Sequence, residues 1–567
     1  MSSSDPKVFV LGLDGADWKI LDHMIERGVM PTLKRMKEEG AWGKLNSTIP
    51  PMTCPAWISF GTGKNPGRFG VYYFTMKRKN SYREAPYFFV RDPHGDNFWD
   101  ILSRKGKKVG IVNIPIMHKP QELNGFMICG FTTPNKNYRI STDEIKEGIA
   151  SSIAYPPSVM EDLVENIGEY HIDPPEKYTP KWANMSVEAR FRSFVKTMRI
   201  RKEALLHLMK SNEWDLMATD IMLTDRLSHE LYQVISADGM KYDTTAGSNM
   251  RETIETIYAE VDGVIRDIRE AAGDDCYFFI MSDHGFGNQT GKFAVNDWLI
   301  KNGYLFMKKS GAGQEKRKPP LKLRAYHLLS RISRKLKLSL IIERFMKLLP
   351  LKMRSTIPTP FVKFEIDDVD WSRTRVYYRS LGQLYVNLKG REPEGVVLEG
   401  EKNNLVDEVI EKMEKDSLEY FKDDKQLRIL KAKEIYSGRY LKDAPDIYFD
   451  LGADDQKEFY AVDTQIGFGS IFMKDPAHMY GFHRQKGIFV LDHPDSEPGE
   501  HSDLNLIDIC PTVLQLFDEE IPGDVDGRFL KEIFKQGSRI STVPERKGST
   551  AERSRIDNAI SGLKMKI

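Results

Sequence analysis

The chain has 567 residues, with 83 Lys and Arg against 82 Asp and Glu, and a formal net charge of +1. This length allows about three domains, or one large enzyme core with insertions. The 40% hydrophobic and 11% aromatic content excludes wholesale disorder, and the near-zero net charge argues against a uniformly basic nucleic-acid-binding protein. Four isolated cysteines without a CxxC pair support neither a zinc ribbon nor a dense disulfide framework.

Short apolar runs alternate with amphipathic stretches, a pattern that predicts an α/β fold with a mostly parallel central sheet and helices on both faces. The first run, Val8–Leu13, is too short for a signal-peptide core or a membrane span, and no long uncharged apolar stretch follows it. We therefore expect a cytoplasmic protein. The other predicted strands are Lys108–Asn113, Asp215–Asp220, Tyr277–Ser282 and Gly487–Leu491, and the predicted helices include Arg190–Lys210 and Met250–Ala272.

Composition divides the chain into four parts. Residues 1–305 and 361–535 are predicted to form the two parts of the core, and residues 536–567 a polar C-terminal tail. Residues 306–360 are predicted to be a basic, amphipathic helical insertion or cap between the two core parts, because apolar positions recur there at helical spacing.

Acidic and imidazole side chains stand beside several predicted strands. Asp14 follows the first strand directly, and Asp283 and His284 follow another. Asp225 and His229 are four residues apart, which places them on one face if the segment is helical, and His483 lies shortly before the last strand. Because ligands bind outside the strand ends of such sheets, these residues predict a site for a divalent ion, Zn²⁺ or Mn²⁺.

A hydroxyl group stands at the start of a predicted helix. Thr53 precedes Cys54-Pro55 and the apolar stretch Ala56–Phe60. Such a hydroxyl can cap the helix, or it can meet a phosphate at the positive helix end and attack phosphorus when a divalent ion is near.

Together these residues resemble the alkaline phosphatase superfamily in its type I phosphodiesterase/nucleotide pyrophosphatase branch, with the predicted phosphohydrolase/phosphomutase group as the most similar. The resemblance runs from about Lys7 to Leu530. Its markers, in chain order, are Gly12–Gly15, Pro51–Trp57, Gly63–Gly67, Asp225 with His229, Ser282–Phe286, Gly481–Gly487 and Asp508–Thr512.

The resemblance implies two metal ions and a covalent intermediate. One ion would be held by Asp225, His229 and His483, and the other by Asp14, Asp283 and His284, with Thr53 between metal and phosphate. Thr53 would attack a phosphomonoester or phosphodiester and form a phospho-threonine that water hydrolyses. The alternatives are a phosphomutase of the same superfamily, and a non-catalytic binding or scaffold protein that has kept the fold.

The sequence also departs from its relatives. Related nucleotide pyrophosphatases carry an Asn shortly after a Pro-Gly-Lys-His-Gly motif, whereas this chain has Pro66-Gly-Arg-Phe-Gly70 and no such Asn, which argues against a nucleotide diester specificity. The segment Cys54–Ile58 lacks the Cys-x-Pro-x-Arg motif of sulfatases. Arg68 and Asn113 are candidate substrate contacts, although turn chemistry explains Asn113 equally well.

The insertion dominates the charge distribution. Residues 308–354 contain 15 Lys and Arg but only two acidic residues, a local charge of +13, which leaves 68 basic against 80 acidic residues elsewhere. The segment is either a cap packed on the core or a peripheral anchor on an anionic membrane surface, and nucleic-acid binding is the less favoured interpretation. A membrane anchor would make a lipid-linked phosphoester a natural substrate. The oligomeric state stays open.

Overall fold

The computed structural model describes residues 6–89, 97–131, 133, 138–235, 245–308, 364–422, 427–452, 460–466, 470–474 and 481–548. Nearly all of the predicted basic insertion therefore lies outside the described residues, as does the end of the predicted tail from residue 549. Within the described residues, no helix is both long and apolar enough to cross a bilayer.

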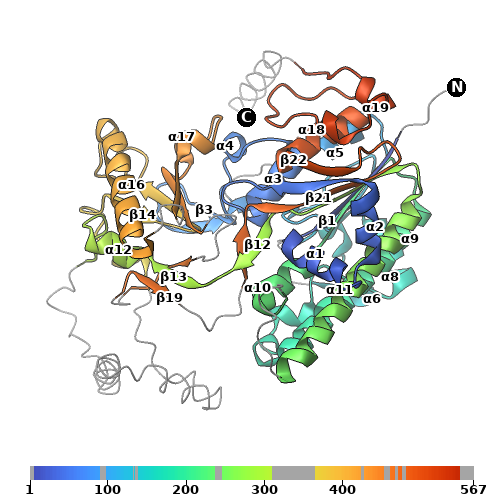
Figure 1. The fold of residues 1–567 in the computed structure, drawn as a ribbon, viewed down its shortest axis with the longest axis horizontal. Coiled ribbons are helices and arrows are strands. Elements are labelled where there is room, and N and C mark those ends of the chain that lie inside the picture. Colours follow the sequence, from blue (N-terminus) through green and yellow to red (C-terminus); the bar gives the residue numbers. More distant parts are fainter. Residues whose placement is uncertain are drawn as a thin grey trace.

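A nine-stranded sheet forms the centre of the molecule (Figure 1). Five adjacent strands of it are mutually parallel, and antiparallel pairs occur toward both edges, which confirms the predicted mostly parallel α/β class. All five predicted strands are present in it. The spatial order is β22 (Gly499–Asn505), β2 (Ala41–Asn46), β21 (Lys486–Asp492), β11 (Cys276–Met281), β1 (Lys7–Leu13), β10 (Leu216–Ile221), β5 (Val109–Val112), β6 (Gly125–Ile128) and β8 (Ala154–Tyr155).

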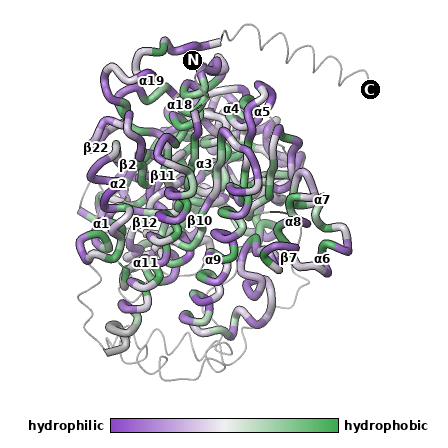
Figure 2. Tube along the Cα trace, turned by 90° about the vertical axis from the view of Figure 1, so that its right-hand side faces the viewer, coloured by the Kyte–Doolittle hydropathy of each residue, from purple (hydrophilic) through white to green (hydrophobic). Residues whose placement is uncertain are grey.

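Each face of this sheet carries its own layer of helices, because successive side chains of a strand point to opposite faces. In β1, Phe9 and Leu11 pack into one apolar cluster and Val8 and Val10 into another. The first cluster includes side chains of α1 (Trp18–Glu26), α2 (Pro31–Glu39), α9 (Val187–Ser211) and α11 (Thr245–Ala272). The second includes side chains of α3 (Thr53–Thr62), α5 (Phe98–Arg104) and α18 (Ile509–Leu516). Figure 2 shows hydrophobic stretches gathered along the central strands β10 and β11.

A second, smaller sheet lies beside the first (Figure 1) and was not foreseen from the sequence. Its four antiparallel strands are β14 (Val376–Tyr378), β15 (Gln383–Val386), β17 (Ile447–Leu451) and β16 (Leu427–Lys431). They share an apolar core with α12 (Val295–Lys301) and α16 (Glu399–Phe421). The predicted core part 361–535 therefore contributes to both sheets.

A two-stranded antiparallel ribbon lies between the two sheets. It consists of β12 (Gly285–Asn288), which follows β11 after a short turn, and β20 (Gly481–Arg484), which precedes β21. Phe286 is paired with His483 in this ribbon. The strand β21 runs antiparallel to β11, so its beginning lies at the edge of the main sheet where β11 ends. This reversal brings a residue that precedes β21 to the carboxyl-terminal edge of the parallel strands.

Candidate metal centre

Two aspartates emerge side by side from the centre of the main sheet. Asp14 follows β1 and Asp283 follows β11, and these parallel strands are adjacent, with Gly12 opposite Met281. Both carboxylates are fully buried. The backbone N–H of Gly15 donates to Asp283 Oδ1 over 3.1 Å, which ties the two strand ends together. The structure thus places both residues where the sequence predicted them.

The third acidic residue comes from the helix after β10. In α10 (Leu223–Ile235), Asp225 and His229 share one face, as their spacing predicts, and Asp225 Oδ1 lies 3.3 Å from His229 Nε2. Thr224 Oγ1 donates to the carbonyl oxygen of Asp14 over 2.6 Å, and this bond fixes the start of the helix against the end of β1.

The remaining two imidazoles lie in the ribbon between the sheets or directly before it. His284 precedes β12 and His483 lies in β20, and their rings stack with centroids 3.6 Å apart. His483 Nε2 lies 3.5 Å from Asp225 Oδ1 and 3.0 Å from His229 Nε2. His284 Nε2 lies 3.3 Å from Asp283 Oδ2 and 3.7 Å from Asp14 Oδ1. All six predicted ligands therefore meet at one edge of the main sheet.

Backbone carbonyls select the tautomers of two of these histidines. His483 Nδ1 lies 3.1 Å from the carbonyl oxygen of Pro51, and His284 Nδ1 lies 3.2 Å from that of Gly285. Because a carbonyl only accepts, each Nδ1 carries the proton and each Nε2 presents a lone pair to the centre of the cluster. This is the usual arrangement of metal-binding histidines, in which the outer nitrogen is held by a backbone or carboxylate oxygen.

The donor atoms fit divalent cations. Asp14 Oδ1, Asp225 Oδ1 and Asp283 Oδ2 are buried and accept no hydrogen bond from any residue that the structure describes. Two groups of three side chains each have ligand atoms within 4.8 Å of one another, namely Asp225 with His229 and His483, and Asp14 with Asp225 and His284. Lone pairs that converge in this way without protons between them require positive charge, and mixed oxygen and nitrogen donors suit a borderline divalent ion.

Burial and neighbouring charges shift the pKa values of these side chains. Burial, reinforced by Asp283 and Asp225, raises the pKa of Asp14 well above its usual value. Burial raises the pKa of Asp283 to about 8 and, together with His483, lowers the pKa of His284 well below its usual value. Although burial opposes ionisation of Asp225, the neighbouring His229, His483 and Arg226 hold its pKa well below the usual range.

Thr53 stands beside this cluster at the first residue of α3. The N-cap residue of that helix is Met52, so the simple capping role that the sequence left open does not describe Thr53. The hydroxyl is buried, and Thr53 Oγ1 lies 3.3 Å from His284 Nε2. The side chain therefore combines a position at a positive helix end with direct contact to a candidate ligand.

The two predicted substrate contacts have other surroundings. Arg68 binds Asp526, with hydrogen bonds of 2.8 and 2.7 Å from Nε and 2.6 Å from Nη2. No contact joins Arg68 to the six candidate ligands among the described residues. Asn113 is buried just after β5 with a φ of 57°, and its amide atoms have no hydrogen-bond partner in the described part of the chain. Their roles in substrate binding stay predictions.

Sequence reasoning missed two polar residues at this edge of the sheet. Asp220, near the end of β10, is buried, and both of its oxygens lack a hydrogen bond to any described residue. Its pKa is raised well above the usual value by burial and by Asp283. Arg226 follows a candidate ligand directly, and its Nη1 donates to Asp225 Oδ2 over 3.2 Å. Two sequence features could have identified them: Asp220 is a carboxylate inside an apolar strand, and Arg226 is a cation next to a predicted ligand.

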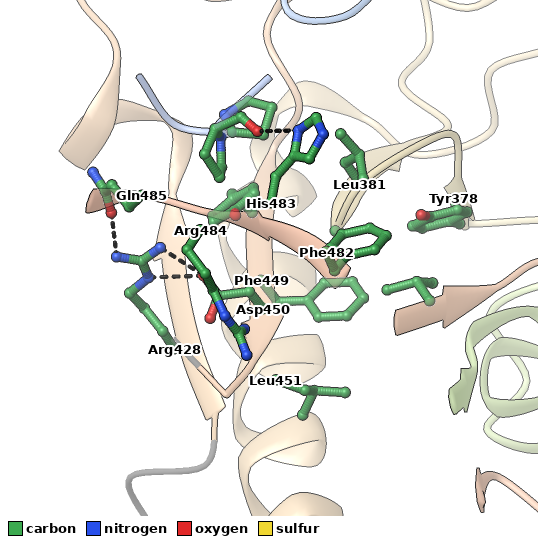
Figure 3. Close-up of a pocket in the computed structure, with 15 residues that line it drawn as sticks. Tyr378, Leu381, Arg428, Phe449, Asp450, Leu451, Phe482, His483, Arg484 and Gln485 are labelled. Atoms are coloured by element: carbon green, nitrogen blue, oxygen red, sulfur yellow. Dashed lines mark hydrogen bonds and ion pairs between the residues drawn. The ribbon is translucent and has the colours of Figure 1, made fainter. Parts of the chain in front are cut away.

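A cavity lies between the cluster and the second sheet. Its wall includes the aromatic side chains of Tyr378, Phe449 and Phe482, and His483 lies at one side of it (Figure 3). Figure 3 also shows Arg428 bound to Asp450, with Nε–Oδ2 at 2.8 Å, at the polar end of the cavity. The second sheet thus covers one flank of the candidate metal centre.

The fold and this site define a class of protein. Carboxylates, imidazoles and a helix-terminal hydroxyl gathered at the strand ends of an α/β sheet are the parts from which metal-dependent phosphoester hydrolases are built. A family model described as type I phosphodiesterase / nucleotide pyrophosphatase matches residues 8–463. The chain belongs to this family, and with it to the phosphoester hydrolases of the alkaline phosphatase superfamily.

Solved structures with a similar course of the chain were also found. Murine ectonucleotide pyrophosphatase/phosphodiesterase 5 in complex with AMP is 10% identical, with 91% of this chain and 96% of that chain covered and a TM-score of 0.42. Phosphonoacetate hydrolase from Sinorhizobium meliloti 1021 in complex with phosphonoformate is 14% identical, with 90% and 95% covered and a TM-score of 0.46. None of the curated proteins compared with this chain matches it significantly.

Proposed function

We propose that this protein hydrolyses phosphoesters through a phospho-threonine intermediate at Thr53, with two divalent cations bound by the six clustered ligands. The observation that carries the proposal is the contact between Thr53 Oγ1 and His284 Nε2, 3.3 Å apart, because it places a helix-terminal hydroxyl against buried, unpaired ligand atoms. Bound cations would lower the pKa of a hydroxyl and neutralise charge on the phosphoryl oxygens.

The steps of the proposed hydrolysis are assigned to residues of the chain as follows. Thr53 is the nucleophile: its Oγ forms a bond to phosphorus as the bond from phosphorus to the leaving oxygen breaks, and the hydroxyl proton leaves to solvent. Water then attacks phosphorus, the bond from phosphorus to Thr53 Oγ breaks, and the hydroxyl is restored; a monoester substrate yields phosphate, and a diester substrate yields the remaining phosphomonoester. The amide groups at the start of α3 face the phosphoryl group, since the first N–H groups of a helix have no partner within it.

The ligands divide between the two cations as follows in this proposal. Asp225, His229 and His483 hold one ion, and Asp14, Asp283 and His284 hold the other. Zn²⁺ suits this donor set, and Mn²⁺ is the second candidate. The substrate is a phosphomonoester or a phosphodiester.

The nucleophile can be tested with two substitutions at one position. Thr53→Ala removes the hydroxyl, and we expect kcat/KM to fall about 1,000-fold or more, whereas Thr53→Ser keeps a hydroxyl and should retain measurable turnover. The assay screens chromogenic phosphomonoesters, phosphodiesters and lipid phosphates with Zn²⁺ or Mn²⁺ supplied. Acid-quenched protein should carry a phosphoryl group on Thr53.

Metal content measured on the same samples separates loss of the nucleophile from loss of the site. Equal rates for wild type and Thr53→Ala would refute the mechanism. Absence of turnover with every substrate would favour the scaffold alternative, and transfer of the phosphoryl group within one substrate molecule would favour a phosphomutase.

We also propose that residues 308–354 hold the enzyme at an anionic membrane surface on the cytoplasmic side. The local charge of +13 supports this, since each Lys or Arg near an anionic leaflet contributes about 1 kcal/mol. Flotation with anionic vesicles should recover the protein at low salt and release it at high salt. Flotation that is the same with neutral vesicles would contradict the proposal.

A further inference from the structure

A pair of cations lies beside the candidate metal centre and is not used by the proposed chemistry. Arg226 follows the ligand Asp225 in α10, and Lys177 lies in the short helix η2 (Pro175–Tyr178). Both stand over the ring of Phe131, with Arg226 Cζ 5.3 Å and Lys177 Nζ 5.4 Å from its centroid. Phe131 follows β6 at the carboxyl-terminal edge of the parallel strands, where ligands of such sheets bind.

The guanidinium of Arg226 is only partly satisfied. Its Nη1 donates to Asp225 Oδ2 over 3.2 Å, but its Nε and Nη2 are buried and have no hydrogen-bond partner among the residues that the structure describes. A buried N–H without a partner costs about 1–3 kcal/mol, and more on a charged group. Asp225 cannot neutralise Arg226 fully, because its other oxygen faces His229 and His483. One edge of this cation is therefore free to accept an anion.

Lys177 adds a second, partly buried positive charge. Its Nζ donates to Asp173 Oδ2 over 2.9 Å, and Tyr178 donates to the same oxygen over 2.5 Å. Burial and the charge of Arg226 lower the pKa of Lys177, whereas Asp173 and Asp225 raise it. The ammonium and the guanidinium repel each other, Asp173 offsets part of this repulsion because it faces both cations, and an anion between them would offset more of it.

The surroundings of the two cations are aromatic. Phe131 is half-buried, and its ring meets that of Phe74 edge to face at a centroid distance of 6.2 Å. Phe74 lies in the segment that follows α4 (Pro66–Phe69), beyond the helix that begins at Thr53. Aromatic walls exclude water and strengthen the attraction of a fixed cation pair for an anion.

We propose that Arg226 and Lys177 form a subsite for a second anionic group of the substrate, a carboxylate or a further phosphate, beside the ester that is cleaved. The inference rests on the proposed function and narrows it: the substrates are phosphoesters that carry another oxyanion. Planar guanidinium donors suit the paired oxygens of either group. Arg226 and Lys177 are thus specificity-determining residues, whereas Thr53 and the six ligands serve the chemistry.

The test compares aryl phosphates that differ in one substituent. The substrates are carboxyphenyl phosphate, its neutral analogue carbamoylphenyl phosphate, and phenylene bisphosphate, each as the meta and para isomer. For wild type, we expect kcat/KM for at least one anionic substrate to exceed that of the neutral analogue by about tenfold or more, since a charge-assisted hydrogen bond is about twice as strong as a neutral one. If the carboxyphenyl phosphate is preferred more strongly over the neutral analogue, the second anion is a carboxylate. If the phenylene bisphosphate is preferred more strongly, it is a phosphate.

Variants locate the preference in the subsite. In Lys177→Met and in Arg226→Met, the ratio of kcat/KM for the anionic substrate to kcat/KM for the neutral one should fall close to one. Lys177→Arg should restore the ratio of wild type. Lys202→Gln is the matched control, because Lys202 is buried to a similar degree and bonds Asp267 over 2.9 Å; its ratio should equal that of wild type. Binding of carboxybenzenephosphonate and carbamoylbenzenephosphonate to the Thr53→Ala protein, measured by calorimetry, should show the same difference without turnover.

Two outcomes would contradict the proposed subsite. One is a kcat/KM ratio of anionic to neutral substrate near one in wild type for all isomers, and the other is a wild-type ratio that persists in both Met variants. Both are distinct from failure of the proposed function. If Thr53→Ala hydrolyses the substrates as fast as wild type, the mechanism at Thr53 fails. If hydrolysis depends on Thr53 but shows no preference for a second anion, the subsite alone fails.

Discussion

His483 Nδ1 lies 3.1 Å from the carbonyl oxygen of Pro51, two residues before Thr53. This bond links the ribbon that carries His483 to the start of the helix that carries the proposed nucleophile. It orients the imidazole with Nε2 toward Asp225 and at the same time fixes the loop that leads into α3. One contact therefore couples ligand geometry to the position of the hydroxyl.

Loss of His483 should remove one metal ion. In His483→Gln the side chain no longer provides an imidazole nitrogen near Asp225 and His229, and we expect bound metal to fall by about one ion per chain and kcat/KM by about 100-fold or more. Elemental analysis of the purified protein gives the number of metal ions bound per chain. His501→Gln is the control, because His501 is only half-buried and bonds only the carbonyl of Glu497 among described residues. Unchanged metal content in His483→Gln would contradict its role as a ligand.

Metal removal should destabilise the protein, because three buried carboxylates would lose their counter-charges. Zn²⁺ or Mn²⁺ at about 100 times its dissociation constant should restore about 2.7 kcal/mol to the free energy of unfolding for each site it fills. Melting curves with a chelator and with added metal measure the difference. In Asp283→Asn the metal response should shrink, while the metal-free protein melts no earlier than wild type because one repelling carboxyl is gone. A variant that responds to metal like wild type would argue against Asp283 as a ligand.

The stability of the protein should depend on pH through Asp17, the buried N-cap residue of α1. Its carboxylate accepts from the N–H of Lys19 over 2.8 Å, yet burial raises its pKa from 3.8 to about 6. The folded state therefore keeps this proton to a higher pH than the unfolded state, so the stability contributed by Asp17 is present at low pH and is lost as pH rises from 3.8 through about 6.

Asp17→Asn isolates this contribution, since Asn also caps helices and does not ionise. Relative to the variant, wild type should lose about 1 kcal/mol of unfolding free energy between about pH 5 and about pH 7.5. Urea titrations at both pH values, at constant free metal concentration, give the difference. A difference between the two proteins that is the same at both pH values would disprove the raised pKa.

The ribbon between the sheets requires glycine at its first position. A Cβ atom on Gly285 would lie 1.9 Å from the carbonyl oxygen of Lys486, closer than any packing permits. Gly285→Ala should lower the free energy of unfolding by about 2 kcal/mol or more and weaken metal binding, because it displaces the strand that follows His284. Gly400→Ala in α16 is the control: nothing lies within 4 Å of its added Cβ, and Ala favours helix, so this variant should be at least as stable as wild type. Chemical denaturation of both variants measures the effect.

The sequence was sufficient for features whose signals are local. The run Val8–Leu13 and the run Tyr277–Ser282 predicted two central strands, and the residues that follow them, Asp14 and Asp283, lie at the strand ends as expected. The four-residue spacing of Asp225 and His229 predicted a shared helix face for the same reason: a helix repeats every 3.6 residues whatever surrounds it.

Features that depend on distant parts of the chain could not be predicted. The direction of β21 is set by its pairing with β11 and β2, and nothing within Gly487–Leu491 encodes it. The strands of the second sheet are short, and three of them, β14, β15 and β17, are buried throughout or nearly so, so they lack the alternation that reveals a half-exposed strand. The bond between Arg68 and Asp526 could not be predicted either, because the two residues are remote in sequence.

The candidate ligands are spread along almost the whole chain, from Asp14 to His483, and the last of them joins the others only when β20 pairs with β12. Synthesis proceeds from the N-terminus, so a nascent chain possesses five of the six ligands well before the sixth leaves the ribosome. Prematurely ended or proteolytically shortened chains can keep several central strands and still lack a complete site. If the cluster binds metal as proposed, full metal loading requires a chain that extends at least through His483 and has β20 paired with β12.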